Sequence, residues 1–107
     1  MHPIPLTDKT WLYRIQPARD GMLADGPMPE EERVVGEHFE YLKELAEKGI
    51  VLLAGRTLNV DPSSFGIVIF KALDESEARS IFEGDPAVRA GVFRGEVYPY
   101  QVALGKL

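Results

Sequence analysis

Residues 29–58, PEEERVVGEHFEYLKELAEKGIVLLAGRTL, decide the fold because they join an amphipathic helix directly to an apolar strand. Pro29 and the three carboxylates after it favour a first helical turn, where proline fits and negative charge meets the positive end of the helix dipole. Apolar residues then recur at helical spacing, as Val35, Phe39, Leu42, Leu45 and Ala46. Gly49 ends this helix, and residues 50–58 open with the continuous apolar run of a central strand.

Two further strands and a second helix flank this unit. Residues 10–16, TWLYRIQ, alternate between bulky apolar and polar side chains, which is typical of a strand with one buried face. Residues 65–72 form another strand after a turn at residues 59–64. Asp74, with Glu77 three residues later, resembles a capping box and begins the second helix.

The C-terminal third completes the pattern. The second helix ends at Gly84, and residues 85–91, DPAVRAG, have the form of a single capped turn. Residues 97–104 supply a last strand, in which Pro99 implies an edge or a bulge. The order strand, helix, strand, strand, helix, strand predicts an α+β fold of the ferredoxin-like β-α-β-β-α-β type. In this fold two helices cover one face of a four-stranded antiparallel sheet, and residues 1–107 make a single domain.

The second face of this sheet has no helix to cover it. Leu12 lies on that face, while Trp11, Tyr13 and Ile15 point to the buried one, so the open face is not strongly polar. A chain of this length buries only about two-thirds of the surface that its unfolded form exposes. Since an exposed apolar sheet face usually marks an association surface, we predict a homodimer or a higher oligomer built from it.

The composition argues against several classes of function. The chain has 12 basic and 17 acidic residues, a net charge of -5 and no basic block, so nucleic acid is not an expected partner. No cysteine is present, which leaves no disulfide, thiolate nucleophile or cysteine-ligated metal. The first ten residues lack the apolar core of a signal peptide, and no apolar run approaches the ~18 residues of a membrane span. We expect a cytoplasmic protein without a membrane partner.

Residues 17–28 form a connection of about a dozen residues, which is longer than most loops and typical of functional or mobile ones. Met22 and Leu23 lie within it. We interpret this loop as a candidate lid over a pocket.

The stretches EHFEYLKEL (residues 37–45), LLAG (52–55) and DPAVRAGVF (85–93) resemble the YCII-related domain, in the same order and at the same spacing, and the similarity runs over nearly the entire chain. The resemblance implies a dimeric α+β barrel with a catalytic histidine and aspartate, at positions that match His38 and Asp85. It also implies chemistry of the kind linked to the family, namely dehydrochlorination of hydroxylated aromatics and reactions of lactones. The chain departs from the family pattern where Gly-Pro is common, with Arg56 after the glycine, and where an aromatic is common after Asp-Pro, with Ala87.

His38 is the histidine that the sequence favours for chemistry, at the margin of the apolar stripe of its helix. As a general base it needs one ring nitrogen held by a carboxylate and the other free, and Asp85 is the candidate carboxylate. The plain alternative is that His38 is an interior histidine bonded to backbone and Asp85 is only the cap of the turn that follows. His2 is assigned no role.

Other polar residues are weaker candidates for binding. Arg56 and Arg94 could place a cation beside an anionic substrate, and Tyr13 and Tyr41 could hydrogen-bond a ring hydroxyl. For each of them a solvated or packing role is the ordinary alternative. One interior histidine without cysteine does not make a zinc site, and no glycine-rich phosphate loop is present, so we predict neither a metal nor a cofactor.

Two functions follow from these residues. The first is a cofactor-independent enzyme in which His38 abstracts a proton and Asp85 orients it, giving elimination or isomerisation of a small phenolic or lactone-like molecule. The second is a non-enzymatic dimeric module that binds a small molecule or a partner protein, in which the same pair only holds two elements together. Loss of turnover on replacing His38 distinguishes the first from the second.

Overall fold

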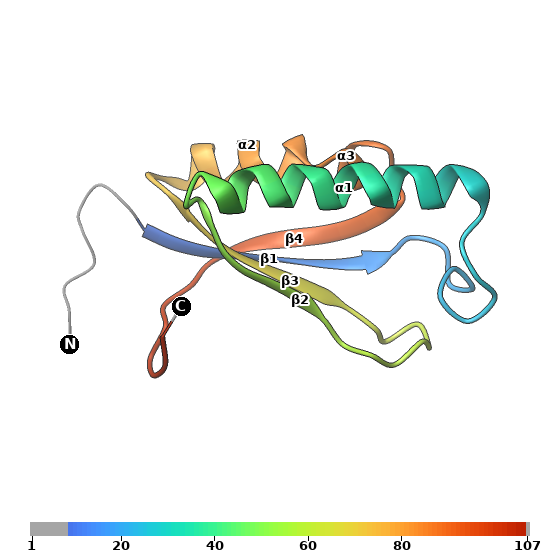
Figure 1. Cartoon of the computed structure of the whole chain (residues 1–107). Coiled ribbons are helices and arrows are strands. Elements are labelled where there is room, and N and C mark those ends of the chain that lie inside the picture. The colour runs from blue at the N-terminus through green and yellow to red at the C-terminus, as the bar shows by residue number, and fades with distance from the viewer. Residues whose placement is uncertain (1–8, 107) are drawn as a thin grey trace.

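The computed structural model describes residues 9–106, in which helices lie on one side of a single twisted sheet (Figure 1). His2 lies outside the described residues. The elements, in chain order, are β1 (Lys9–Pro17), α1 (Pro29–Glu47), β2 (Val51–Arg56), β3 (Gly66–Ala72), α2 (Glu75–Gly84), α3 (Pro86–Arg89) and β4 (Phe93–Pro99). The four strands pair antiparallel in the order β2-β3-β1-β4. The α+β fold with a four-stranded antiparallel sheet is therefore confirmed.

The core lies between the helices and the sheet face formed by alternate residues of β1. Trp11, Tyr13 and Ile15 are buried there, as the alternation in the sequence predicts. Phe70 of β3 pairs with Trp11, and Val68 pairs with Tyr13, so both extend the same buried face. The Tyr13 and Phe70 rings meet edge to face with centroids 5.7 Å apart. This packing fixes the tyrosine on which the candidate site below depends.

The open face of the sheet carries apolar side chains from all four strands, together with charged ones. By register, the apolar side chains on this face are Leu12, Leu53, Ile67, Ile69 and Tyr98. Leu53 and Tyr98 are each 41% exposed. The homodimer stays a prediction. Among residues 9–106, no helix combines the length and the apolar character that crossing a bilayer requires.

Helix α1 turns a different face to the core from the predicted stripe. Its buried residues are Val34, His38 and Leu42, whereas Phe39 is 61% exposed. The stripe predicted from the apolar residues alone is rotated around the helix axis away from the face that is buried. The rotation arises because the polar His38 occupies an interior position and does not count toward such a stripe. Val35 and Phe39 instead border an open cavity beside the core.

The position predicted for the last strand, residues 97–104, is wrong. β4 is Phe93–Pro99, so it begins four residues earlier and ends at the proline. Arg94 and Glu96 hide the alternation because they point to the open face, and Gly95 between them offers no side chain to the core. Proline lacks the N–H that would continue the ladder.

Gly95 marks the closest approach between β4 and β1. A Cβ built on it lies 2.2 Å from the carbonyl oxygen of Arg14, a backbone atom that cannot move without disturbing the strand pair. We expect Gly95→Ala to lower the free energy of unfolding by about 2–3 kcal/mol in urea denaturation. Gly55→Ala on β2 is the matched control, since nothing lies within 4 Å of its Cβ and its effect is expected below about 0.5 kcal/mol. Equal effects at the two glycines would contradict the close approach.

Candidate active site

Asp85 lies at the junction of α2 and α3, where it ends one helix and begins the next. Its backbone is extended, with φ −64° and ψ 122°, as a residue before proline prefers. One carboxylate oxygen, Oδ1, accepts a 2.9 Å hydrogen bond from the N–H of Ala87 and so caps α3. The cap that the sequence predicts for the Asp85-Pro86 pair is therefore present, and it leaves the second oxygen for other partners.

The second oxygen, Oδ2, accepts from two side chains inside the core. His38 Nδ1 lies 2.6 Å from it and the Tyr13 hydroxyl donates to it at 2.7 Å. Asp85 is fully buried and His38 is 5% exposed. Burial, and then the negative charge of Asp85, raise the pKa of Tyr13, so its hydroxyl keeps its proton and acts as a donor. The carboxylate thus ties β1, α1 and α3 together.

The contacts of Asp85 orient the imidazole of His38. The carboxylate accepts from Ala87 and Tyr13, so the Nδ1 of His38 is placed to donate to it as well, and Nε2 is the ring nitrogen left for other partners. Within residues 9–106 Nε2 has no hydrogen-bond partner, and no buried side-chain nitrogen or oxygen there lacks one, so Nε2 is reached from the cavity that His38 lines. The rings of Phe39 and Phe93 flank the imidazole in edge-to-face arrangements, with centroids 5.6 and 5.2 Å away. This is the arrangement of a positioned base beside an apolar space.

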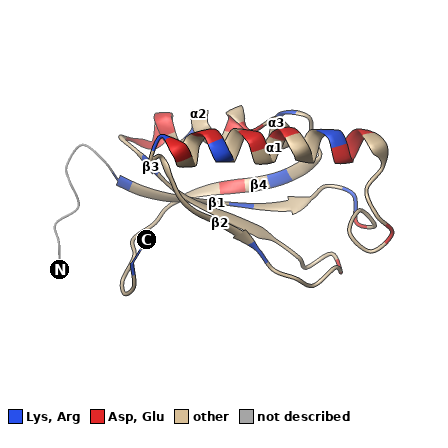
Figure 2. Ribbon diagram, in the orientation of Figure 1, with Lys and Arg blue, Asp and Glu red and all other residues tan. Residues whose placement is uncertain are grey.

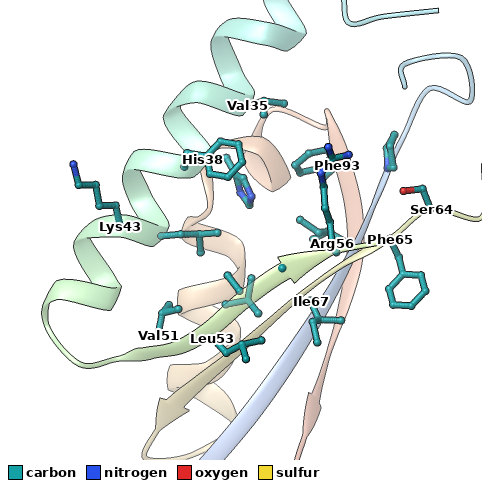
Figure 3. Close-up of a pocket in the computed structure, with 18 of the residues that line it drawn as sticks. Val35, His38, Lys43, Val51, Leu53, Arg56, Ser64, Phe65, Ile67 and Phe93 are labelled. Carbon is teal, nitrogen blue, oxygen red and sulfur yellow. The ribbon is translucent and has the colours of Figure 1, made fainter. Parts of the chain in front are cut away.

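That space is a cleft of about 820 Å³ between α1 and β2, here called the α1–β2 cleft (Figure 3). It is within the size range of small-molecule sites, about 300–1,000 Å³. It remains open because the residues of β2 and β3 that face α1 at this end include Ala54 and Gly66, which fill little volume. His38 and Phe93 line one wall, and Arg56 stands at the end of β2.

Residues 17–28 lie at one end of the cleft, where Met22, Leu23 and Pro27 line it. Arg19 anchors this loop. Its guanidinium binds both carboxylate oxygens of Glu31 on α1, at 3.0 and 2.7 Å, and the carbonyl of Gly26 at 3.1 Å. The loop is therefore held as a wall of the cleft, and its movement as a lid stays a prediction.

The anchor of this loop should weaken when Glu31 is neutral. Hydrogen bonds from Arg19 and from the N–H of Met28 lower the pKa of Glu31 to about 2 from an ordinary 4.5. Because the folded value is the lower one, the ion pair stabilises the loop above about pH 4.5, and this stabilisation is lost as the pH falls toward 2. We expect Glu31→Gln at neutral pH to speed amide hydrogen exchange at Met22 and Asp25 by about twofold to fivefold.

Glu40→Gln is the control for that measurement. Glu40 is exposed on the same helix and makes no ion pair in the described part of the chain, so loop exchange should not change. Faster exchange in both variants would mean that loss of helix charge, and not loss of the anchor, loosens the loop.

The structure brings together some of the residues singled out from the sequence and separates others. Tyr13 is fully buried behind Asp85, so it supports the carboxylate and does not line the cleft. Arg94 points to the opposite sheet face, beside Arg14 and Glu96. Tyr41 donates to the carbonyl of Ile81 at 2.6 Å and links α1 to α2. Of the two arginines considered, only Arg56 lines the α1–β2 cleft.

Sequence reasoning missed the roles of Tyr13 and Phe93 at this site. Tyr13 is an inward-facing residue of a strand, where a hydroxyl needs a buried partner, and that signal pointed to a polar group in the core. Phe93 gave no signal, because it precedes the polar residues that hid the start of β4. Among residues 9–106 no three His, Cys, Asp or Glu side chains gather as a metal-binding group.

Fold and site together define a small ferredoxin-like α+β domain with a buried histidine–aspartate pair at an open cleft. The profile of the YCII-related domain matches residues 12–101, and the chain belongs to the YCII-related domain family. The comparison with curated proteins gives no significant match.

Solved structures that share this fold include two proteins. One is 5-chloro-2-hydroxyhydroquinone dehydrochlorinase (TftG) from Burkholderia phenoliruptrix AC1100 in complex with 2,5-dihydroxybenzoquinone, which is 23% identical with a TM-score of 0.61 over 85% of this chain and 93% of that chain. The other is protein TM1266 from Thermotoga maritima, which is 14% identical with a TM-score of 0.55 over 88% of this chain and 99% of that chain. At these identities the likeness concerns the fold.

Proposed function

We propose that this protein is a cofactor-independent enzyme that eliminates from, or isomerises, a small phenolic or lactone-like molecule. His38 is the general base and Asp85 orients it. The observation that carries the proposal is the 2.6 Å contact between His38 Nδ1 and Asp85 Oδ2, which leaves Nε2 unpartnered in residues 9–106 and next to the α1–β2 cleft. A base so placed contributes about 10²–10⁴ to a rate.

The chemistry needs only a proton acceptor. Nε2 takes a proton from a hydroxyl or an activated C–H of the substrate, and the electron pair left behind forms a new double bond. In an elimination that electron shift expels the leaving group as an anion; in an isomerisation the proton returns at another carbon. The imidazolium that forms stays next to Asp85, whose buried negative charge stabilises it. In an elimination, release of the proton to solvent restores the base; in an isomerisation, the return of the proton to the substrate restores it. Neither reaction requires an electron acceptor.

One structural neighbour supports an activity of this kind. TftG, of the same fold, is named as a dehydrochlorinase of a chlorinated hydroxyhydroquinone, and loss of hydrogen chloride is an elimination. The apolar walls of the cleft suit a ring, because side chains such as Val35, Leu42 and Phe93 line it.

A turnover screen without cofactor tests the proposal. We expect the wild type to accelerate either chloride release from 5-chloro-2-hydroxyhydroquinone or solvent deuterium incorporation into small lactones and phenols, measured by ion chromatography and by NMR. The acceleration should saturate with substrate. No acceleration over buffer for any member of the panel would contradict the proposal.

A second candidate function is a non-enzymatic binding module, and one observation favours it. The carboxylate of Asp85 binds Ala87, His38 and Tyr13, so it would hold three elements together even without any reaction. In that case ligands would occupy the α1–β2 cleft unchanged. Saturable binding without turnover in the screen above would favour this function.

A further inference from the structure

We infer that the molecule held in the α1–β2 cleft carries a carboxylate and that Arg56 binds it. The inference rests on the proposed function for the identity of the site, and it adds the charge of the substrate. It starts from the position of Arg56 in the sheet. Arg56 is the last residue of β2 and pairs with Gly66, which in turn pairs with Ile15 of the buried face. Its side chain therefore leaves the sheet on the side of His38, as Figure 3 shows.

Arg56 lacks the partner that several other arginines have. Within residues 9–106, Arg19, Arg33 and Arg79 each pair with a glutamate, whereas no carboxylate lies within ion-pair distance of Arg56. Arg14, Arg89 and Arg94 also lack an ion pair within residues 9–106, but of these four arginines only Arg56 lines the α1–β2 cleft.

The surroundings of Arg56 increase its attraction for an anion. Arg56 is the only charged residue of β2 and its last one, and Figure 2 shows β2 in tan up to a blue segment at its end. The other charged residues that line the cleft are Glu32 and Lys43 of α1, and Lys43 points away from the strand in Figure 3. Arg56 is exposed to solvent and borders largely apolar walls, so the positive charge that it presents to the cleft favours an anionic ligand.

The shape of the guanidinium selects the kind of anion. Its planar fork donates two parallel hydrogen bonds that match the two oxygens of a carboxylate. Gly66 and Ala54, next to Arg56 in the sheet, leave room for such a group to lie flat against the strand. A ligand held by its carboxylate at Arg56 and packed against Phe93 presents the rest of its ring to His38, and two-point binding of this kind orients the proton to be removed.

Paired probes test the inference without requiring turnover. We would measure the binding of 2,5-dihydroxybenzoate and of 2,5-dihydroxybenzamide by NMR titration, since the two differ at one substituent, which is a carboxylate in the first and a neutral amide in the second. The wild type is expected to bind the carboxylate about tenfold or more tightly than the amide, a preference that falls as salt is added. Arg56→Gln should remove the preference and Arg56→Lys should restore part of it. Arg94→Gln, with the same change of charge on the opposite sheet face, should keep it.

The outcomes separate this inference from the proposed function. Equal binding of the two probes, no saturable binding of either, or an equal loss in Arg56→Gln and Arg94→Gln overturns the inference. The same titration in His38→Gln reports on the base, because carboxylate binding should persist there. A preference that depends on Arg56 in a protein without turnover supports the inference and contradicts the proposed enzyme. Turnover that depends on His38 but not on Arg56 supports the proposed enzyme and contradicts the inference.

Discussion

Replacing His38 with Gln is expected to lower kcat by about 10²–10⁴-fold on any substrate found in the screen, with KM changed little. Glutamine has a similar length and can still hydrogen-bond to Asp85 Oδ2, but it has no lone pair that takes up a proton at neutral pH. The pH dependence of kcat/KM should lose the limb that reports the free base. Initial rates over a range of pH, with wild type and variant side by side, make the measurement.

The loss of kcat is informative only if the His38→Gln protein is still folded. His38 is 5% exposed, so urea denaturation of His38→Gln accompanies the kinetics. Glu40→Gln is the control on the same helix, since Glu40 is exposed and does not line the α1–β2 cleft. A folded His38→Gln protein with unchanged kcat would remove His38 from the reaction.

Substitutions at Asp85 are expected to have the second large effect: Asp85→Asn should lower the rate, and Asp85→Ala should lower the stability. Asp85→Asn keeps an oxygen that can accept from the Ala87 N–H, but its NH₂ group then faces His38 Nδ1. The imidazole must offer a lone pair there and carry its proton on Nε2, which can no longer act as the base. By analogy with the same substitution in serine proteases, we expect kcat to fall by about 10⁴-fold.

The tautomer gives a readout that a structural role alone does not. The ¹⁵N chemical shifts of His38 should show Nδ1–H in the wild type and Nε2–H in Asp85→Asn. The double variant His38→Gln/Asp85→Asn should lose little more activity than either single one, because the two residues act as a unit. Additive losses, or an unchanged tautomer, would contradict a working pair.

Asp85→Ala removes the acceptor altogether and should act on stability. The Ala87 N–H, the Tyr13 hydroxyl and His38 Nδ1 lose their shared partner, and each buried donor left unsatisfied costs about 1–3 kcal/mol. A loss of at least about 3 kcal/mol follows, a large part of the stability of a domain this small. Tyr13→Phe removes a single donor and keeps the ring, so its loss should be smaller, about 1 kcal/mol. Urea denaturation compares the two, and equal losses would contradict the shared acceptor.

The fold was largely predictable because local signals agree with one another. The proline and carboxylates at the start of α1, the alternation in β1 and the Asp74 cap of α2 each act over a few residues. The failure at β4 has a physical cause, since Arg94, Gly95 and Glu96 follow the requirements of the open face and of a close strand contact. The pattern of apolar residues in a sequence does not reveal which residues face the open side of the sheet or where two strands approach closely.

The candidate site was predictable only in part. His38 and Asp85 are far apart in sequence, and no spacing rule joins them, so their pairing came from the resemblance to the YCII-related domain. The Asp85 cap was visible locally. The separation of Arg56 from Arg94 was not, because it depends on which residues of β2 and β4 face α1, and for β4 the register was mistaken.

Asp85 binds three groups, namely the Tyr13 hydroxyl, His38 Nδ1 and the Ala87 N–H. One part of the site therefore tolerates substitution and another part does not. A substitution at Asp85 or Tyr13 would impair both folding and the reaction, so selection should remove such substitutions as homologues diverge. Ala54 and Arg56 contribute to the shape and charge of the cleft without holding the buried carboxylate. New specificities should therefore arise first on β2, and a randomised library for directed evolution belongs at these two positions.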